Sequence, residues 1–493
     1  MLVLIVVGAL CAVAMWALMR PSQISPPLYP GGLPLIGHAY QMLGDAQGNC
    51  HMWKFQTNLF HYCMNNEGIV KFFLGTHPVF VVTDPDDCFK IANTCLEKPY
   101  FYSFAKEMCK NGLVTASVSK WKLHRRLLNP AFNQQVMNTF VTEYNAQART
   151  LVSLLAAKVG KNPFDVQRYL VNSLLTTVCR TSLGLKDQDR RMIGKDYAHA
   201  TEELIAIFVE RLQTIWLHSP YMFSWSSLKT KQDKLVEVTK GIIKKVIKKR
   251  KSELKANYII EGNYNSLSEK FKPLLDQMLD LAEKQDAFTD DEIIEHLNTV
   301  VVAAFDTTAT AMTYTLILIG SHQDMQERIY KELQTVLGDQ DRDLTKYDLQ
   351  KLVYLDAVLK ESLRLYSPVP TVARSICSDV QLKDYILPAG SSCLISVYGV
   401  NRHPVWGADA DQFRPERWLD PATLPDNPNA FATFSLGRRN CIGKLYGMMT
   451  MKTTLAHILR RYRVSGNISN VQTQCDILIK PLSGHEIRLE LRT

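Results

Sequence analysis

The chain begins with an uninterrupted apolar run, Leu2–Met19, that contains no charged residue and no proline. A helix over this run would be ~27 Å long at ~1.5 Å per residue, close to the ~30 Å hydrocarbon core of a bilayer. A cleaved signal peptide is the alternative, although it would have a charged start and a shorter apolar core. We predict an uncleaved anchor over residues 1–20. Arg20 follows the run, which places the body on the cytosolic side.

The residues after the anchor predict a linker and one folded body. Residues 21–40 are rich in proline and glycine, and proline fixes φ and cannot continue a helix. This segment is therefore expected to be a stiff, extended spacer. Residues 41–493 then form a single body that is large enough to enclose a cofactor.

The hydrophobic pattern of this body predicts a mostly helical fold with a small β-rich part. Residues 68–83 have the pattern of two short strands with a turn at Gly75–Pro78, and residues 380–400 alternate in the same way. Residues 120–260 are largely helical in pattern. Their helical stretches enclose an aromatic-rich loop, His218–Ser227, that could either pack on the body or enter a membrane interface.

Two helices are predicted in the second half of the body. A capping box at Thr289 and Glu292 begins a long helix that ends near Gly320. This helix is apolar on most faces, so it should pass through the core. A second helix is expected from about Tyr347 to Tyr366.

Composition excludes several classes of protein. The chain is 46% hydrophobic and 21% charged, which fits neither a disordered chain nor a polytopic membrane protein. The net charge of +9 is mild, and it gives no support for a nucleic-acid partner. The basic run Lys244–Lys255 is either a solvated helix face or a surface near anionic lipid.

The cysteines point to a reducing compartment. There are eleven, and no pair has C-x-x-C spacing. Zinc ribbons, thioredoxin motifs and ferredoxin clusters therefore find no support. Scattered single cysteines are mostly small buried hydrophobes, and only one needs another explanation.

That cysteine is Cys441, in the segment Phe434–Gly443, which reads FSLGRRNCIG. It ends a long irregular loop, residues 401–437, just before a last predicted helix from about Lys444 to Tyr462. A thiolate near a helix N-terminus is stabilised by the helix dipole and by free N–H groups. Such a sulfur can be an axial iron ligand or a nucleophile, and the local signatures of cysteine proteases are absent.

F-x-x-G-x-R-x-C-x-G, from Phe434 to Gly443, resembles the haem-binding loop of the cytochrome P450 superfamily. The resemblance covers residues 26 to about 485. It is to animal microsomal members, in the group that contains the fatty-acid ω-hydroxylases, and an insect member is expected. It implies the cytochrome P450 fold, with residues 41–493 as a haem-thiolate catalytic domain, and haem b held by a Cys441–iron bond.

Three further motifs resemble the family's pattern. Glu361 and Arg364 match E-x-x-R, and Arg417 would be the third member of a triad that fixes the loop carrying Cys441. The segment Ala303–Thr308 resembles the oxygen-activation motif, which implies Asp306 and Thr307 as a proton relay. Ala304 stands where glycine is usual. Many members of the group carry a glutamate at the position of Ala303, and that glutamate is esterified to haem. Alanine cannot form this ester, so the resemblance implies non-covalent haem here.

The resemblance also implies the residues that hold the haem. Trp121 and Arg125 match W-x-x-x-R, and haem carries two propionates whose burial requires cationic donors. The full set expected to bind the cofactor is Trp121, His124, Arg125, Arg374, Phe434, Arg439, Cys441 and Gly443. Phe101, Phe104, Ile205, Phe208 and Phe305 would make an apolar substrate pocket.

The reaction implied is monooxygenation of an apolar small molecule by O2. Electrons would come from an NADPH–cytochrome P450 reductase, with cytochrome b5 as an additional candidate. The expected location is the cytosolic face of the endoplasmic reticulum membrane. Two rivals stay open: a haem isomerase or dehydratase that needs no electrons, and a haem-binding sensor or carrier. Fatty acid, hormone, odorant, pheromone and plant toxin all fit the pocket described.

Overall fold

The computed structural model describes Gly8 and residues 25–43, 51–186, 189, 192–261, 272–338 and 340–492. The predicted anchor lies outside these residues except for Gly8. Part of the predicted linker lies inside them and packs on the body. The N–H of Tyr29 donates to the Lys71 carbonyl oxygen at 2.8 Å, and the Tyr29 ring contacts Phe55 and Tyr62.

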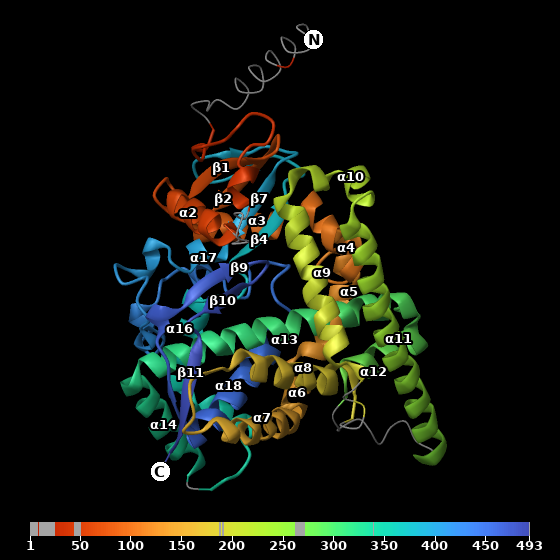
Figure 1. Ribbon diagram of the computed structural model, residues 1–493, viewed down its shortest axis with the longest axis vertical. Coiled ribbons are helices and arrows are strands. Elements are labelled where there is room, and N and C mark those ends of the chain that lie inside the picture. The colour runs from red at the N-terminus through yellow and green to blue at the C-terminus, as the bar shows by residue number, and fades with distance from the viewer. Residues whose placement is uncertain are drawn as a thin grey trace.

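The protein has a large helical part and a smaller sheet-containing part on the N-terminal side (Figure 1). The longer helices are α2 Met52–Met64, α3 Pro85–Thr94, α5 Val118–Leu128, α6 Gln134–Thr139, α7 Val141–Leu155, α8 Gln167–Leu183, α9 Lys195–Gln213, α11 Ser227–Glu261, α12 Leu274–Gln285, α13 Asp290–Ser321, α14 Gln323–Leu337, α15 Lys346–Lys351, α16 Val353–Leu365 and α18 Lys444–Arg461. Short helical turns include η2 Tyr100–Ala105, α4 Lys106–Cys109, η6 Ile215–His218, α10 Pro220–Ser224 and α17 Val397–Val400. The fold is therefore mostly helical with small sheets, as the sequence predicts.

Four small sheets complete the fold. The strands are β1 Ile69–Leu74, β2 His77–Val82, β3 Phe164–Asp165, β4 Thr371–Ser375, β5 Val380–Gln381, β6 Ile386–Leu387, β7 Ser392–Ser396, β8 Tyr462–Ser465, β9 Gln472–Cys475, β10 Ile479–Ser483 and β11 Glu486–Leu491. The largest sheet has the order β1-β2-β7-β4, in which β7 runs parallel to β2 and antiparallel to β4. This sheet joins the predicted N-terminal hairpin to strands almost 300 residues later in the chain, and the remaining strands pair as β3-β11-β8, β9-β10 and β5-β6.

Helix α13 forms the centre of the helical part and crosses the middle of Figure 1. The predicted capping box is present, because Thr289 Oγ1 accepts from the Glu292 N–H and Glu292 accepts from the Thr289 N–H. Within the described residues, α13 is the one helix that is long and apolar enough to cross a membrane, and 72% of its most apolar window is buried. It packs against α8, α16, α18 and β8, so it is a core helix.

The structure differs from the predicted second helix. That helix is broken at Leu352 into α15 and α16. The Glu332 carboxylate on α14 accepts hydrogen bonds from the N–H groups of Tyr354 and Leu355, at 2.6 and 3.0 Å. It thereby satisfies free donors at the start of α16, which explains why a new helix begins there.

Lys249, Arg250 and Lys251 of the basic run on α11 are paired with acids. Arg250 contacts Asp276, and Lys251 contacts Asp290. These contacts favour the solvated helix face for these three residues, and both interpretations remain open for the rest of the run.

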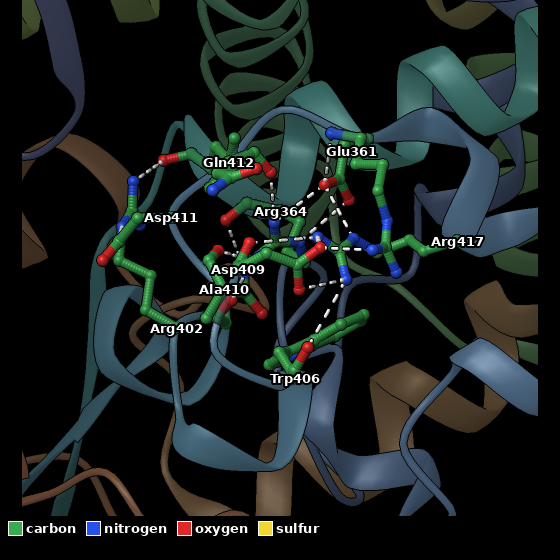
Figure 2. A network of polar contacts seen from close by, with 12 residues as sticks. Glu361, Arg364, Arg402, Trp406, Asp409, Ala410, Asp411, Gln412 and Arg417 are labelled. Carbon is green, nitrogen blue, oxygen red and sulfur yellow. Dashed lines mark hydrogen bonds and ion pairs between the residues drawn. The ribbon is translucent and has the colours of Figure 1, made fainter.

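The carboxylate of Glu361 on α16 is the centre of a buried polar network (Figure 2). Arg364 donates to it at 2.8 and 2.9 Å, and Arg417 Nε donates at 2.9 Å. All three side chains have no exposed surface. Burial, the largest single influence, raises the pKa of Glu361, but Arg364 and Arg417 together lower it below its usual value. The predicted triad is therefore present and ionised.

This network fixes the irregular loop that leads to Cys441. Arg364 Nη1 donates to the carbonyl oxygen of Asn401 at 2.7 Å, and Nη2 donates to that of Gln412 at 3.2 Å. Arg417 Nη2 donates to the Asp409 carbonyl oxygen at 3.1 Å. The loop has few regular backbone hydrogen bonds of its own, so these guanidinium groups supply partners for carbonyls that would otherwise be buried without one.

We expect Glu361→Gln to destabilise the protein by about 3–5 kcal/mol, because the substitution removes the charge of the carboxylate that two buried guanidinium groups share. The free energy of unfolding, from urea titration followed by circular dichroism, measures the effect. Glu107→Gln breaks an exposed pair with Lys110 and is the matched control. Equal stability of the two variants would show that the network does not hold the loop.

Candidate functional site

Cys441 ends the irregular loop three residues before α18 begins at Lys444. Its N–H donates to the Phe434 carbonyl oxygen at 2.9 Å, which closes the loop. Burial raises the pKa of the Cys441 thiol above its usual value, and a backbone hydrogen bond from Gly443 and the charges of Arg125 and Lys444 offset part of this rise. The loop therefore presents one sulfur among donors and cations, a setting that favours thiolate coordination to a metal ion.

Two glycines shape this loop as predicted. Gly437 has φ +66°, and a Cβ there would come within 2.8 Å of the Ala92 backbone on α3. Any side chain at Gly437 would therefore separate the loop from α3. A Cβ at Gly443 would come 3.9 Å from Cys441 Sγ and would occupy space beside the sulfur that a flat ligand needs.

Two buried arginines lie together close to this loop. Arg374 on β4 donates only to the Ala373 carbonyl oxygen at 2.9 Å, and Arg439 donates only to that of Ala116 at 2.8 Å. In the described part of the chain, two nitrogens of each guanidinium are buried without a hydrogen-bond partner. Burial, and then the charge of Arg374, lower the pKa of Arg439 to about 10. The Arg439 guanidinium also stacks on the Trp121 ring at 4.7 Å.

A third cation, Lys98, joins this pair, and the sequence analysis did not identify it. Burial and the charges of Arg374 and Arg439 hold the pKa of Lys98 well below its usual value. Its ammonium group lies 4.5 Å from the centre of the Tyr102 ring. Because Lys98 belongs to no sequence motif, only the three-dimensional neighbourhood could reveal it.

This arrangement fits haem b. Cations buried without a counter-charge are costly, and unsatisfied N–H groups add to that cost. The two propionates of a haem would supply two negative charges and acceptors for the unpartnered nitrogens of Arg374 and Arg439. The single sulfur of Cys441 and the small residue Gly443 fit the same ligand.

Two predicted haem-binding residues have other partners. Arg125 donates to the carbonyl oxygen and side-chain oxygen of Asn440, at 2.7 and 3.0 Å, so it holds the residue before Cys441. His124 Nδ1 lies 2.8 Å from Nε2 of His296 on α13, and both rings are buried. A direct contact of Arg125 or His124 with the cofactor stays a prediction.

Asp306 and Thr307 on α13 also have different partners. Asp306 Oδ2 lies 2.6 Å from Lys480 Nζ on β10, whereas Thr307 Oγ1 donates to the Ala303 carbonyl oxygen at 2.7 Å. No hydrogen bond between the two side chains is found in the described residues. Asp306 and Lys480 line a polar cleft of about 500 Å³ between α8 and α9. Lys480, 174 positions after Asp306, belongs to no motif and was missed.

Three of the five predicted pocket residues gather in one cluster. Phe101 and Phe104 from η2 pack with Phe208 from α9 and with Ala373, next to Arg374. Ile205 packs instead against the cluster beneath the largest sheet. Phe305 belongs to the main helical core cluster, and its role as a pocket residue stays a prediction.

Comparisons with known proteins agree with this site. The family profile described as Cytochrome P450 matches residues 26–485. Cytochrome P450 4g15 of Drosophila melanogaster is 28% identical over 94% of this chain and 92% of its own length. Cytochrome P450 4c21 of Blattella germanica is 30% identical over 87% and 86%, and cytochrome P450 4V2 of Homo sapiens is 27% identical over 97% and 91%.

The fold has a solved counterpart. The crystal structure of the cytochrome P450DA heme domain matches with a TM-score of 0.79 and covers 95% of this chain and 98% of that chain, at 20% identity. These findings confirm the resemblance and the fold that the motifs predicted. The chain belongs to the cytochrome P450 family of oxidoreductases, monooxygenases that bind haem b through a cysteine thiolate.

Proposed function

We propose that this protein inserts one oxygen atom of O2 into an apolar small molecule, with electrons from an NADPH-dependent reductase. The observation that carries the proposal is the single thiol of Cys441 beside the unpartnered guanidinium groups of Arg374 and Arg439. Cys441 would be the iron ligand, and Lys98, Arg374 and Arg439 would hold the propionates. The haem, when bound, supplies the oxygen chemistry, and the thiolate donates electron density to the iron.

The residues of α13 would supply protons. Thr307 Oγ1 accepts a proton from water on one side and passes its own to the reacting oxygen on the other. Asp306 would receive protons from the polar cleft, whose walls from α8 and α9 carry Arg168, His199 and Glu202. Lys480 holds the Asp306 carboxylate at the inner end of this cleft. The two side chains would then connect solvent to an otherwise apolar helix.

Electrons would enter beside Cys441. Lys122 and Arg126 on α5, Arg438 in the loop and Lys444 at the start of α18 are all exposed. Arg125 ties α5 to the Cys441 loop through Asn440, so these cations belong to neighbouring elements. An acidic reductase, with cytochrome b5 as a second donor, would be attracted to such a surface.

We expect NADPH to be consumed only when reductase and an apolar substrate are both added. An isomerase or dehydratase would turn over without NADPH, and a sensor or carrier would not turn over.

Cys441→His should abolish the thiolate-type carbon monoxide spectrum, since imidazole donates less charge than thiolate. Cys377→His, at the other exposed cysteine of the described residues, is the control. If Cys441→His kept the thiolate-type carbon monoxide spectrum, Cys441 would not be the iron ligand.

Thr307→Ala should leave haem binding intact and waste reducing equivalents. Losing one positioned proton donor typically costs ~10²–10⁴ in the step that it serves. NADPH oxidation should continue while product per NADPH falls and hydrogen peroxide rises. Thr308→Ala is the matched control, because Thr308 makes the same bond to its own helix but is buried. An unchanged ratio of product to NADPH in Thr307→Ala would exclude Thr307 from the relay.

The body would lie on the cytosolic face of the endoplasmic reticulum membrane. Trp216, Tyr221 and Trp225 are 57%, 79% and 86% exposed in and beside η6 and α10, where the sequence left a membrane contact open. A Cβ at Gly75 would come within 4 Å of both Ile215 and the Leu35 backbone, so η6 adjoins the segment that follows the predicted anchor. Exposed aromatic rings are typical of membrane interfaces.

Protease treatment of intact microsomes is therefore expected to digest the body. Trp216→Ser together with Trp225→Ser, in a protein that lacks residues 1–20, should lower binding to lipid vesicles relative to the same protein with both tryptophans. A body fully protected inside the microsomes would reverse the proposed orientation.

A further inference from the structure

Two cysteines among the described residues are exposed, Cys441 and Cys377. Cys441 is the proposed iron ligand, so its exposure has an explanation. Cys377 follows the end of β4 by two residues and has no role in the site described above. An exposed thiol is open to oxidants, and its chemistry then depends on whether a second thiol lies within reach.

The segment that follows α3 lies along β4. The sheet order β1-β2-β7-β4 places β4 at an edge of the largest sheet. The N–H of Ser375 donates to the Glu97 carbonyl oxygen at 2.9 Å, and the N–H of Ala373 donates to Tyr102 Oη at 3.4 Å. The later residue of one segment thus meets the earlier residue of the other, so the two segments run antiparallel.

This direction brings Cys95 opposite Cys377. Cys95 lies two residues before Glu97, and Cys377 lies two residues after Ser375. The backbone of Cys95 is extended, with φ −98° and ψ 94°. Residues opposite one another on antiparallel segments are about 4.5–5.5 Å apart at Cα, within the ~4.4–6.8 Å that a disulfide spans. Burial raises the pKa of Cys95, and a neighbouring Cys377 thiolate raises it further, which agrees with two sulfur atoms in proximity.

The pair lies beside the cations of the proposed haem site. Arg374 is three residues before Cys377, and Lys98 is three residues after Cys95. The Lys98 charge lies close enough to Arg374 to be destabilised by it. A covalent bond between the two sulfur atoms would therefore tie the segment that carries Lys98 to the strand that carries Arg374.

We propose that Cys377 is a site of reversible oxidation by hydrogen peroxide and that Cys95 forms a disulfide with it. Peroxide takes two electrons from the Cys377 thiol, which becomes a sulfenic acid, and one water is released. The Cys95 thiolate then attacks the oxidised sulfur, the S–S bond forms, and the sulfenic oxygen leaves as a second water. Thiol reductants reverse the reaction. Transient disulfides are the kind that reducing compartments contain.

The disulfide would brace the haem site and slow the release of haem. This consequence rests on the proposed role of Lys98 and Arg374 as propionate partners, whereas the disulfide itself does not. A bond that holds the two cationic elements together opposes the opening through which the propionates would leave.

Peptide mapping tests for the bond. The full-length holoprotein in nanodiscs is treated with a small excess of hydrogen peroxide, alkylated and digested without reductant. In the wild type, mass spectrometry should find the peptides of Cys95 and Cys377 joined, and dithiothreitol should separate them. Cys95→Ser should instead leave Cys377 as a sulfenic acid that dimedone traps, an adduct nearly absent from the wild type. Cys393→Ala removes a buried thiol opposite Arg374 on β7 and is the matched control, in which the bond should form as before.

Transfer of haem to apomyoglobin tests the bracing. Peroxide treatment should slow transfer from the wild type ~10-fold, because a disulfide restricts the separation of the segments that it joins. Dithiothreitol should restore the original rate. Cys377→Ser should show neither change, and it controls for damage to haem by peroxide.

Three results of the mapping would overturn the proposal: Cys377 oxidised to sulfinic acid while Cys95 stays free, Cys377 joined to Cys393 or to a second molecule, and both thiols unreacted. An unchanged rate of haem transfer in protein that carries the bond would overturn the bracing of the haem site. Failure of the proposed monooxygenase function would appear separately, in the carbon monoxide spectrum and in NADPH consumption, neither of which reports on the disulfide.

Discussion

The buried carboxylate of Glu361 is the group on which the site depends. A lone carboxylate in this position would be strongly unfavourable, and so would either guanidinium without it. Together, Glu361, Arg364 and Arg417 are stable, and the arginines have donors left over for backbone carbonyls. Those donors define the path of a loop that has little regular structure, and the loop ends at Cys441. The position of a reactive sulfur thus follows from an ion pair that takes no part in the reaction.

Structural and functional arginines differ in whether the protein itself supplies the partner of the guanidinium group. Where the chain itself supplies the counter-charge, as for Arg364 and Arg417, the guanidinium joins elements of the fold. Where guanidinium nitrogens are buried without an acceptor, as in Arg374 and Arg439, we propose that the missing partner belongs to a ligand. Burial alone does not distinguish the two classes, because both are deeply enclosed. The distinction lies in whether each N–H group has an acceptor within the protein.

The sequence predicted those parts of the site whose residues lie close together along the chain. Glu361 with Arg364, and Phe434 with Cys441, lie within ten residues of each other, so their spacing is visible in one dimension. Lys98 and Lys480 escaped prediction because their partners are far away in the chain. The break at Leu352 was missed for the same reason, since the capping Glu332 lies on another helix. Periodicity described the long α13 correctly, because its burial on nearly all sides leaves one continuous apolar pattern.

Helix α13 shows why a polar motif needs its surroundings before a role can be assigned. Asp306 in an apolar helix is accounted for energetically by Lys480, so its presence alone does not require catalysis. Thr307, Thr308, Thr313 and Thr315 all donate to the carbonyl four residues earlier, so that bond does not single out Thr307 either. The difference is accessibility, because the other three are buried and Thr307 is not. Thr307 lies one turn after Ala303, which is exposed. The small, exposed side chain of Ala303 leaves this face of the helix open, and a hydroxyl can exchange protons only where water or a substrate can reach it.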